Sequence, residues 1–233
     1  QRLAFDELLL LQLRGQLTRQ AWSTHQSPSI HFQESLTKQV LADWPFQLTD
    51  DQRRCAWQIL QDLGQDQPML RLLQGDVGSG KTAVAILSML NVAVSGYQAA
   101  LLAPSEVLAS QHFQSLVQAI GQHCSIGLLT RTQQVFSQPG QAIDKLSKAK
   151  LASQIASGDC QLIVGTQALL QEKISFHNLA LLIVDEQQRF GVEQRQLLLN
   201  KKLFQNNGSN LVPHFLAMTA TPIPRSLALT LYG

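Results

Sequence analysis

The residues with the clearest chemical potential are 75–82, which read Gly-Asp-Val-Gly-Ser-Gly-Lys-Thr and match the phosphate-loop pattern G-x-x-x-x-G-K-T. Glycines allow such a loop to wrap inward, so that its backbone N–H groups converge on a polyphosphate at the start of a helix. Lys81 would add positive charge at the terminal phosphates, and Thr82 would offer a hydroxyl to Mg²⁺. The mostly apolar run 69–73 and the helix-prone residues 83–90 disfavour the alternative of a Gly-rich turn with a solvated lysine. The loop residues predicted to bind a nucleoside triphosphate are Gly75, Gly78, Ser79, Gly80, Lys81 and Thr82.

Two acidic residues, Asp185 and Glu186, follow the apolar run 181–184. In a parallel nucleotide-binding sheet, ligands gather at the carboxyl ends of the strands, so we expect both carboxylates to face the cleft of the phosphate loop. Asp185 would hold Mg²⁺ through water, and Glu186 would orient and polarise the water that attacks the γ-phosphate. The alternative is an ordinary acidic pair at a strand end, which the phosphate loop makes less favourable. We therefore predict that Lys81, Asp185 and Glu186 are catalytic and that Thr82 and Asp185 bind the metal.

Gln52, Thr219 and Thr221 are weaker candidates. The amide of Gln52 could pair with the edge of adenine, as Asn and Gln do in nucleic-acid recognition. Thr49 and Gln52 also have the spacing of a helix capping box, so both interpretations of Gln52 stay open. Thr219 and Thr221 follow the apolar strand candidate 214–219 and could couple the state of the γ-phosphate to another surface, although a Thr-Pro turn after a strand is common.

Composition excludes several other kinds of protein. The net charge is only +2 and charged residues make up 15%, so no strongly basic surface indicates nucleic acid by itself. The three cysteines and six histidines have no spacing typical of metal ligands, and the cysteines suit a reducing compartment. No apolar run approaches the roughly 18 residues of a membrane-spanning helix, so we expect no membrane partner.

The elements that must position these residues alternate along the chain. A helix is expected over 49–63, and the other helices over 82–94, 105–120 and 142–156. Short apolar strands are expected at 69–74, 98–103, 125–129, 161–164, 179–184 and 214–219. Residues 130–140 and 206–213 are expected to be surface loops. Strands that alternate with helices predict an α/β fold, with a mainly parallel sheet and helices on both of its faces.

The N-terminal part has a different pattern. Leucines and Phe5 recur at helical spacing over 3–17, and the polar, proline-containing stretch 23–29 is typical of a linker. We therefore expect an N-terminal linking helix and linker over 1–43 and a globular domain over 44–233. Because the chain begins without Met and ends after an apolar stretch, we also expect it to be part of a longer protein.

The order of the motifs resembles the first RecA-like domain of a superfamily 2 helicase. The resemblance is carried by the glutamine motif at 46–52, the phosphate loop and the segments 103–106 (Ala-Pro-Ser-Glu), 165–167 (Gly-Thr-Gln), 185–188 (Asp-Glu-Gln-Gln) and 219–221 (Thr-Ala-Thr). Segments 71–82, 185–192 and 218–225 are more narrowly similar to the RecG-type branch-migration helicases. The transcription-repair coupling factors share the Arg-Phe-Gly-Val sequence at 189–192, and Gln188 is closer to theirs. Gln74, Ser79 and the N-terminal helix favour the RecG type.

The resemblance implies a RecA-like P-loop NTPase domain that uses ATP and Mg²⁺ to move on branched duplex DNA. It implies that Ser105, Gly165 and Thr166 contact the DNA backbone, and such contacts need no large net charge. Gln188, Thr219 and Thr221 would couple hydrolysis to movement. RecG-type helicases typically have His at the positions of Gln167 and Gln188, so any coupling there would use a neutral amide.

The resemblance also implies partners within the same parent chain, namely a wedge domain and a second RecA-like domain that supplies an arginine to the site. The location would be the bacterial cytoplasm, at the nucleoid. Without the second domain we expect weak nucleotide binding and negligible hydrolysis. Two other classes stay open: a non-motor P-loop enzyme such as a small-molecule kinase, which the motifs at 185–188 and 219–221 disfavour, and a non-hydrolysing DNA-binding scaffold, which only Gln188 suggests.

Overall fold

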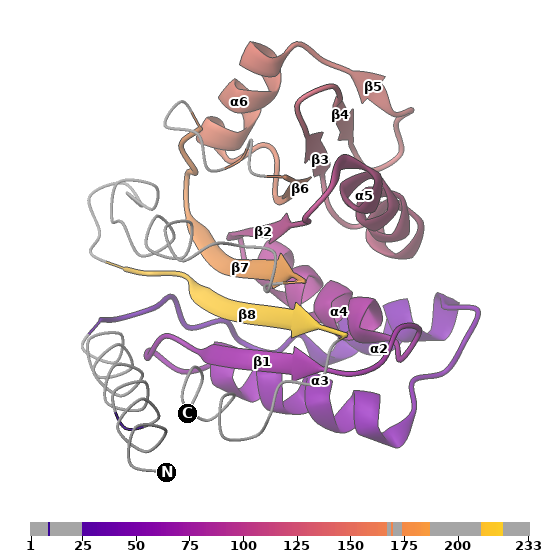
Figure 1. Cartoon of the computed structure of the whole chain (residues 1–233), viewed down its shortest axis with the longest axis vertical. Coiled ribbons are helices and arrows are strands. Elements are labelled where there is room, and N and C mark those ends of the chain that lie inside the picture. The colour runs from indigo at the N-terminus through magenta and orange to yellow at the C-terminus, as the bar shows by residue number, and fades with distance from the viewer. Residues whose placement is uncertain (1–8, 10–24, 167–168, 170–173, 187–210, 221–233) are drawn as a thin grey trace.

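The computed structural model describes Leu9 and residues 25–166, 169, 174–186 and 211–220 of the 233-residue chain. Within these residues the helices are α2 (Glu34–Asp43), α3 (Asp50–Leu63), α4 (Lys81–Val94), α5 (Glu106–Ile120) and α6 (Lys148–Ser157). The strands are β1 (Leu70–Gln74), β2 (Gln98–Leu102), β3 (Ile126–Leu129), β4 (Gln134–Ser137), β5 (Asp144–Lys145), β6 (Leu162–Gly165), β7 (Leu179–Asp185) and β8 (His214–Thr219). Strands and helices alternate from β1 to β3, and α6 separates β5 from β6 (Figure 1).

The strands form one eight-stranded sheet in the order β1-β8-β7-β2-β6-β3-β4-β5. Every pair from β1 to β3 is parallel, whereas β4 is antiparallel to β3 and β5 is antiparallel to β4. Figure 1 shows β8 between β1 and β7, although β8 is the last of the described strands in the sequence. Because β1, β8, β7, β2, β6 and β3 run in the same direction, their carboxyl ends all lie at one edge of the sheet.

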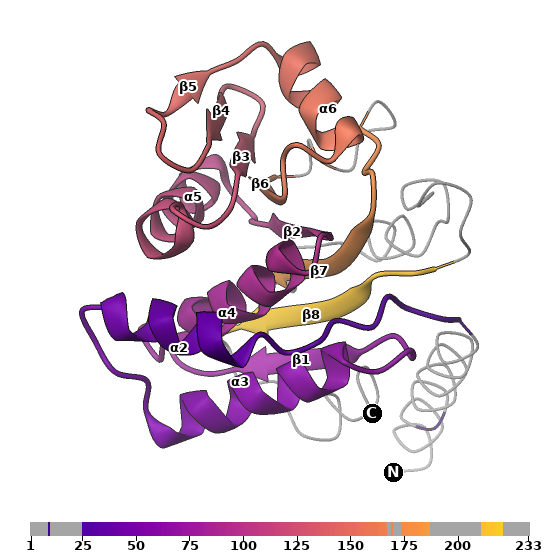
Figure 2. The ribbon, with the colours of Figure 1, turned by 180° about the vertical axis from the view of Figure 1, so that it is seen from behind.

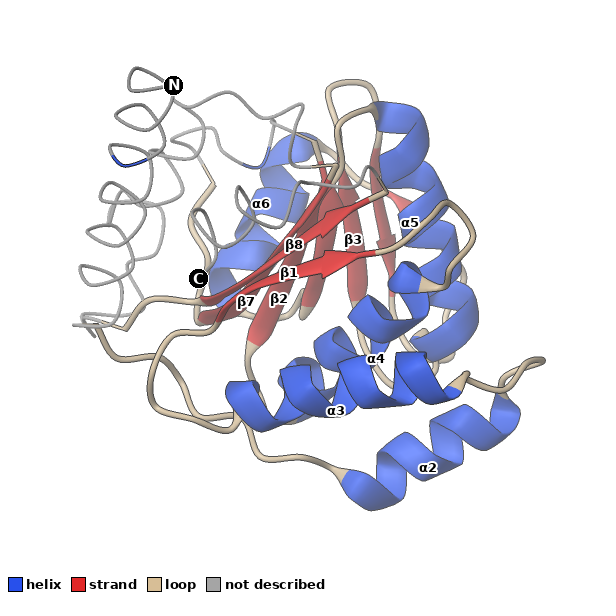
Figure 3. Ribbon diagram, turned by 60° about the horizontal axis from the view of Figure 1, so that its bottom comes forward, coloured by secondary structure: helices blue, strands red, loops and turns tan. Residues whose placement is uncertain are grey.

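Two hydrophobic clusters lie on opposite faces of this sheet, because neighbouring residues of a strand point to opposite sides. Ala99 and Leu101 of β2 pack in the cluster that contains the buried residues of α2 to α5. Ala100 and Leu102 pack in the other cluster, with residues of α6. Figure 3 shows α3 and α4 on one side of the strands and α6 on the other. The predicted α/β fold with helices on both faces is confirmed.

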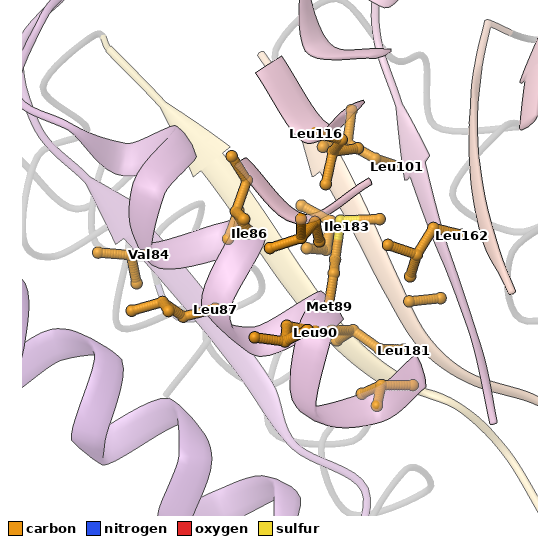
Figure 4. Packing of buried hydrophobic residues seen from close by; sticks show 14 of the residues in the cluster. Val84, Ile86, Leu87, Met89, Leu90, Leu101, Leu116, Leu162, Leu181 and Ile183 are labelled. Carbon is orange, nitrogen blue, oxygen red and sulfur yellow. The ribbon is translucent and has the colours of Figure 1, made fainter. Parts of the chain in front are cut away.

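Helix α4 is the centre of the larger cluster. Its residues 83–93 are all buried, because α2 and α3 cover the side of α4 that faces away from the sheet (Figure 2). Figure 4 shows Met89 and Leu90 of α4 beside Leu181 and Ile183 of β7. The helix that starts at the phosphate loop is therefore held between two layers, which fixes the position of its first turn.

Most predicted elements are confirmed to within a few residues, but the region 130–147 differs. The stretch expected to be a loop contains β4, which pairs with β3 from Leu129↔Gln134 to Ile126↔Ser137. The helix expected from residue 142 begins at Lys148, because Ser147 caps it by accepting a hydrogen bond from the Lys150 N–H. The residues just before it form β5 instead.

Part of the segment before α3 packs against the rest of the fold. Ile30 and Val40 are each 1% exposed and belong to the larger cluster. Gln26 forms a parallel bridge with Leu211, and the Pro28 carbonyl accepts a hydrogen bond from His214 Nε2 at 2.8 Å. Residues from 26 onward therefore pack with the sheet. The helix expected over 3–17 lies outside the described residues, and the division into domains at 43/44 stays a prediction.

Candidate nucleotide-binding and hydrolysis site

The residues predicted to act on the nucleotide come together at the carboxyl ends of three neighbouring strands. The phosphate loop follows β1, Asp185 ends β7 and Thr219 ends β8. In the register of the sheet, Gln74 lies beside Thr219 and Asp185 lies beside Met218. The Gly75 N–H donates to the Thr219 carbonyl at 3.2 Å, so the loop is tied to the end of β8. Segments more than 100 residues apart in sequence thus share one site.

The phosphate loop leaves the start of α4 open to an anion. Gly78 and Gly80 have φ angles of 81° and 82°, in the left-handed region that favours glycine. Gly80 is the N-cap of α4 and has no side chain to accept from the first N–H groups of the helix, and the first turn carries no acidic residue. In contrast, Thr49, Ser105 and Ser147 cap α3, α5 and α6. A helix start with uncapped N–H groups and the positive end of its dipole is suited to bind phosphate.

Lys81 lies over the same loop. Its Nζ donates to the carbonyl of Gly75 at 2.5 Å and to the carbonyl of Asp76 at 2.8 Å. These are bonds to neutral oxygens, so an incoming phosphate would offer the ammonium a stronger, charged partner. Lys81 is therefore positioned to exchange loop carbonyls for phosphate oxygens.

Gln52 makes the capping box and also reaches the phosphate loop. Its Oε1 accepts from the Thr49 N–H at 2.9 Å, and the Thr49 hydroxyl accepts from the Gln52 N–H at 3.3 Å. Its Nε2 donates to the Ser79 carbonyl at 2.8 Å. An amide oxygen has two lone pairs and an amide nitrogen has two hydrogens, so each atom keeps capacity for a second partner. The capping and adenine-binding interpretations are therefore compatible.

Glu186 connects the end of β7 to the segment after β8. It is the only residue other than glycine with a positive φ among the described residues, at 51°. Its Oε1 accepts from the Ala220 N–H at 3.2 Å. A left-handed backbone is uncommon for residues other than glycine, and such conformations concentrate at functional sites. The structure thus joins two motifs that the sequence analysis had predicted to act together.

His112 is a residue of this site that the sequence analysis missed. It lies on α5, and its Nε2 is 2.7 Å from Oδ2 of Asp185. Both side chains are largely buried, with exposed fractions of 10% for His112 and 13% for Asp185. A signal was present in the sequence, because His112 interrupts an otherwise apolar helical stripe. The spacing of the histidines bears only on metal binding, and the apolar stripe of a helix does not identify a partner 73 residues away in sequence.

The residues predicted to contact DNA lie at the same sheet edge, farther from the phosphate loop. The Ser105 hydroxyl accepts from the Leu108 N–H at 3.3 Å and caps α5. Gly165 ends β6, and a Cβ there would lie 2.3 Å from the Leu129 carbonyl oxygen, so close packing alone requires a glycine. Thr166 is half-buried. Ser105 and Gly165 thus have structural roles that do not exclude a contact with a DNA backbone.

Three predicted residues, Gln167, Gln188 and Thr221, lie outside the described residues. Thr219, the remaining coupling candidate, is fully buried at the end of β8. Its carbonyl holds the phosphate loop through Gly75, which links β8 to the loop through the backbone.

The donor set fits a magnesium ion that arrives with a nucleotide. In the part of the chain that the structure describes, no three His, Cys, Asp or Glu side chains form a metal-binding group. Mg²⁺ is commonly held by one or two carboxylates together with water and substrate phosphates, not by a cage of protein side chains. The Asp185 carboxylate and the Thr82 hydroxyl at the start of α4 match that pattern.

Among the helices that the structure describes, none has the length and apolar character needed to span a membrane.

Comparison with known proteins identifies the family of the chain. The family model of the DEAD/DEAH box helicases matches residues 49–230, so the chain belongs to that family. It is 43% identical over 233 residues to the ATP-dependent DNA helicase RecG of Aquifex aeolicus, and 44% identical over 236 residues to that of Haemophilus influenzae. Both matches cover 100% of this chain but only 27% and 32% of the relatives, so the chain spans less than a third of their length.

A solved structure of RecG bound to a three-way DNA junction superposes with a TM-score of 0.79 and 36% sequence identity. The match covers 99% of this chain and 29% of that one. The predicted RecA-like helicase fold and the resemblance to RecG-type helicases are confirmed.

Proposed function

We propose that this chain is the N-terminal, ATP-binding motor domain of a RecG-type DNA helicase that uses ATP hydrolysis to remodel branched DNA in recombination and repair. The observation that carries the proposal is the convergence of the phosphate loop, Asp185 and Glu186 at one sheet edge, with Glu186 bonded to Ala220. The two RecG relatives and the RecG structure support the RecG form of the proposal over a translocase of the coupling-factor type.

Nucleotide binding would use residues that are already arranged. The N–H groups at the start of α4 would receive the phosphates, and Lys81 would transfer its bonds from the loop carbonyls to the β- and γ-phosphates. Gln52 would recognise adenine with the second lone pair and the second hydrogen of its amide. Thr82 and Asp185 would hold Mg²⁺, which when bound neutralises phosphate charge.

Hydrolysis would then depend on Glu186. Its carboxylate would orient a water molecule toward the γ-phosphate and accept a proton from it, giving ADP and inorganic phosphate. Because Glu186 also accepts from the Ala220 N–H, a change at the γ-phosphate would alter a contact with the segment that contains Thr219 and Thr221. With Gln188, these residues would couple hydrolysis to movement.

DNA would bind at the other part of the same edge. Ser105, Gly165 and Thr166 would contact the backbone and so position the duplex without selecting its sequence. The wedge domain, the second RecA-like domain and its arginine would come from the rest of the parent chain. An arginine finger contributes roughly 10³ to 10⁵ in rate, so these 233 residues alone would hydrolyse ATP negligibly. The protein would act in the bacterial cytoplasm at the nucleoid.

The test is ATP turnover by the full-length protein with a three-way junction, with linear duplex and without DNA. We expect the junction to stimulate turnover strongly and Lys81→Ala to abolish it. A turnover rate that does not respond to DNA would contradict a motor. DNA binding without any ATP turnover would instead favour the non-hydrolysing scaffold.

A further inference from the structure

His112 occupies a position where the fold calls for an apolar side chain. The buried residues of α5 recur at helical spacing and form the stripe that faces the sheet: Ala109, His112, Phe113, Leu116 and Ile120. Burying an imidazole costs free energy unless it has a hydrogen-bond partner. The partner is the Asp185 carboxylate at 2.7 Å. The pair therefore replaces apolar packing with a specific polar contact between α5 and the end of β7.

This contact restrains the carboxylate that is predicted to hold Mg²⁺. One oxygen of Asp185 is engaged by His112, and both side chains are almost excluded from solvent. A carboxylate held in this way cannot rotate as freely as one in water. In metal sites, partners that orient a ligand typically contribute 10- to 100-fold to metal affinity or activity.

The same helix reaches the part of the edge where DNA is expected. Ser105 caps α5, and Glu106 in its first turn accepts from the hydroxyls of Thr130 and Thr132 in the turn between β3 and β4. His112 lies seven residues after Ser105, which is about 10 Å along the helix axis. The N-terminal end of α5 is thus fixed to the DNA side of the edge, and its second turn is fixed to the nucleotide side.

From this arrangement we infer that His112 is a positioning residue for Asp185, and that α5 uses it to tie the metal-binding carboxylate to the DNA-contacting end of the domain. The inference rests on the proposed function, because it takes Asp185 as a metal ligand and Ser105 as a DNA contact. It adds a physical route by which DNA binding changes the rate of ATP hydrolysis.

The experiment compares His112→Gln with His112→Asn in the full-length protein. The Gln side chain places its amide nitrogen at about the reach of imidazole Nε2, the atom that contacts Asp185, whereas the Asn side chain is one carbon shorter. The two variants are matched in polarity, so a difference between them reports the contact and not the burial of an amide. His123→Asn, three residues after the end of α5, is the control for losing a histidine.

Two readouts are needed. The first is the affinity for Mn²⁺ in the presence of ADP, measured by electron paramagnetic resonance, which requires no turnover. The second is the ratio of kcat with a three-way junction to kcat without DNA. We expect His112→Asn to weaken Mn²⁺ binding about 10-fold or more and to lower the ratio similarly, and His112→Gln to retain most of both.

The outcomes separate this inference from the proposed function. The role of His112 would be overturned if His112→Asn had the Mn²⁺ affinity and the kcat ratio of the wild type. It would also be overturned if the Asn and Gln variants lost both to the same extent. If DNA did not change the ATP turnover of the wild-type protein, the proposed motor function would be overturned. The Mn²⁺ measurement would still test whether His112 positions Asp185. Melting temperatures within the range of the control show that the variants are folded.

Discussion

The carboxyl edge of the sheet has two parts, which differ in whether a side chain caps the N–H groups at the start of the following helix. In the nucleotide part, at β1, β8 and β7, Gly80 leaves the start of α4 without a side-chain cap. In the far part, at β2, β6 and β3, Ser105 caps α5 and Glu106 accepts from two threonines of the next turn. The nucleotide part keeps donors open for a ligand, and the far part satisfies them internally.

This difference indicates what each part can bind. Open N–H groups at a helix start favour a compact anion that enters the loop, such as a polyphosphate. A capped edge can offer hydroxyl groups and backbone at its surface, which suits an extended partner such as a DNA backbone. The contact of His112 with Asp185 joins the two parts. Changes confined to one part therefore test whether the division is real.

Glu186→Gln should have the largest effect and should be confined to the nucleotide part. The amide keeps an oxygen that can accept from the Ala220 N–H, but it cannot accept a proton from water. We expect ATP turnover by the full-length protein to fall by about 10² to 10⁴, the usual contribution of a general base. Affinities for ATP and for the three-way junction should stay close to those of the wild type. An unchanged turnover rate would mean that Glu186 is not the base.

Gly80→Ala and Gly140→Ala make the same backbone change, the first in the nucleotide part and the second, as a control, in the turn between β4 and β5. Both glycines have a left-handed φ, 82° and 72°, so alanine should cost about 1–2 kcal/mol of stability at either position. A Cβ at Gly80 would lie 2.2 Å from Gln52 Nε2, whereas one at Gly140 would contact nothing within 4 Å. The alanine at 80 should therefore displace Gln52 from the loop.

Nucleotide affinity separates these two variants. We expect Gly80→Ala to weaken ATP binding by roughly 10-fold, or about 1.4 kcal/mol, and Gly140→Ala to leave it unchanged. Fluorescent nucleotide titration measures the affinity, and thermal unfolding measures the shared cost of the backbone. Equal ATP affinities in both variants would show that Gln52 contributes nothing at this site.

The sequence predicted the nucleotide part better than the far part, because the motifs that define the nucleotide part are contiguous in sequence. The phosphate loop is a contiguous pattern, and the start of α3 follows from Thr49 and Gln52, whose capping box the structure confirms. Strand β4 was missed, because its pairing with β3 depends on a tertiary contact and its four residues do not alternate between apolar and polar types.

The same limit explains the other differences between prediction and structure. Pro28 is held by His214, 186 residues away, so composition alone made its segment resemble a linker. His112 was overlooked as a partner of Asp185 because the helix and strand that bring them together are both ordinary in sequence. Local motifs thus gave the chemistry of the site, whereas the contacts between motifs required coordinates.

Ser105→Asp and Ser105→Asn test the far part with the helix cap preserved. Asp, Asn and Ser are about equally good N-caps, so both variants should keep α5 intact. Only Asp places a negative charge where a phosphate is expected. We expect Ser105→Asp to weaken junction binding by about 5- to 10-fold in low salt, less in high salt, and Ser105→Asn to bind nearly as the wild type does. Equal binding of both variants, measured by fluorescence anisotropy, would remove Ser105 from the DNA contact.

Glu106→Gln should have the smallest effect and a characteristic pH dependence. The hydroxyl of Thr132, together with that of Thr130, holds the pKa of Glu106 below its ordinary value of 4.5. A carboxyl whose pKa is lower in the folded state stabilises that state above its unfolded pKa, and this contribution is lost as the pH falls through the folded pKa. The difference in melting temperature between wild type and Glu106→Gln should therefore be small at pH 7, should decline below the ordinary pKa of glutamate and should vanish once the pH is below the lowered pKa of the folded state. ATP affinity should be unchanged, because the substitution lies outside the nucleotide part. A difference in melting temperature that persists at acidic pH would mean that Glu106 holds the turn by packing and not through its charge.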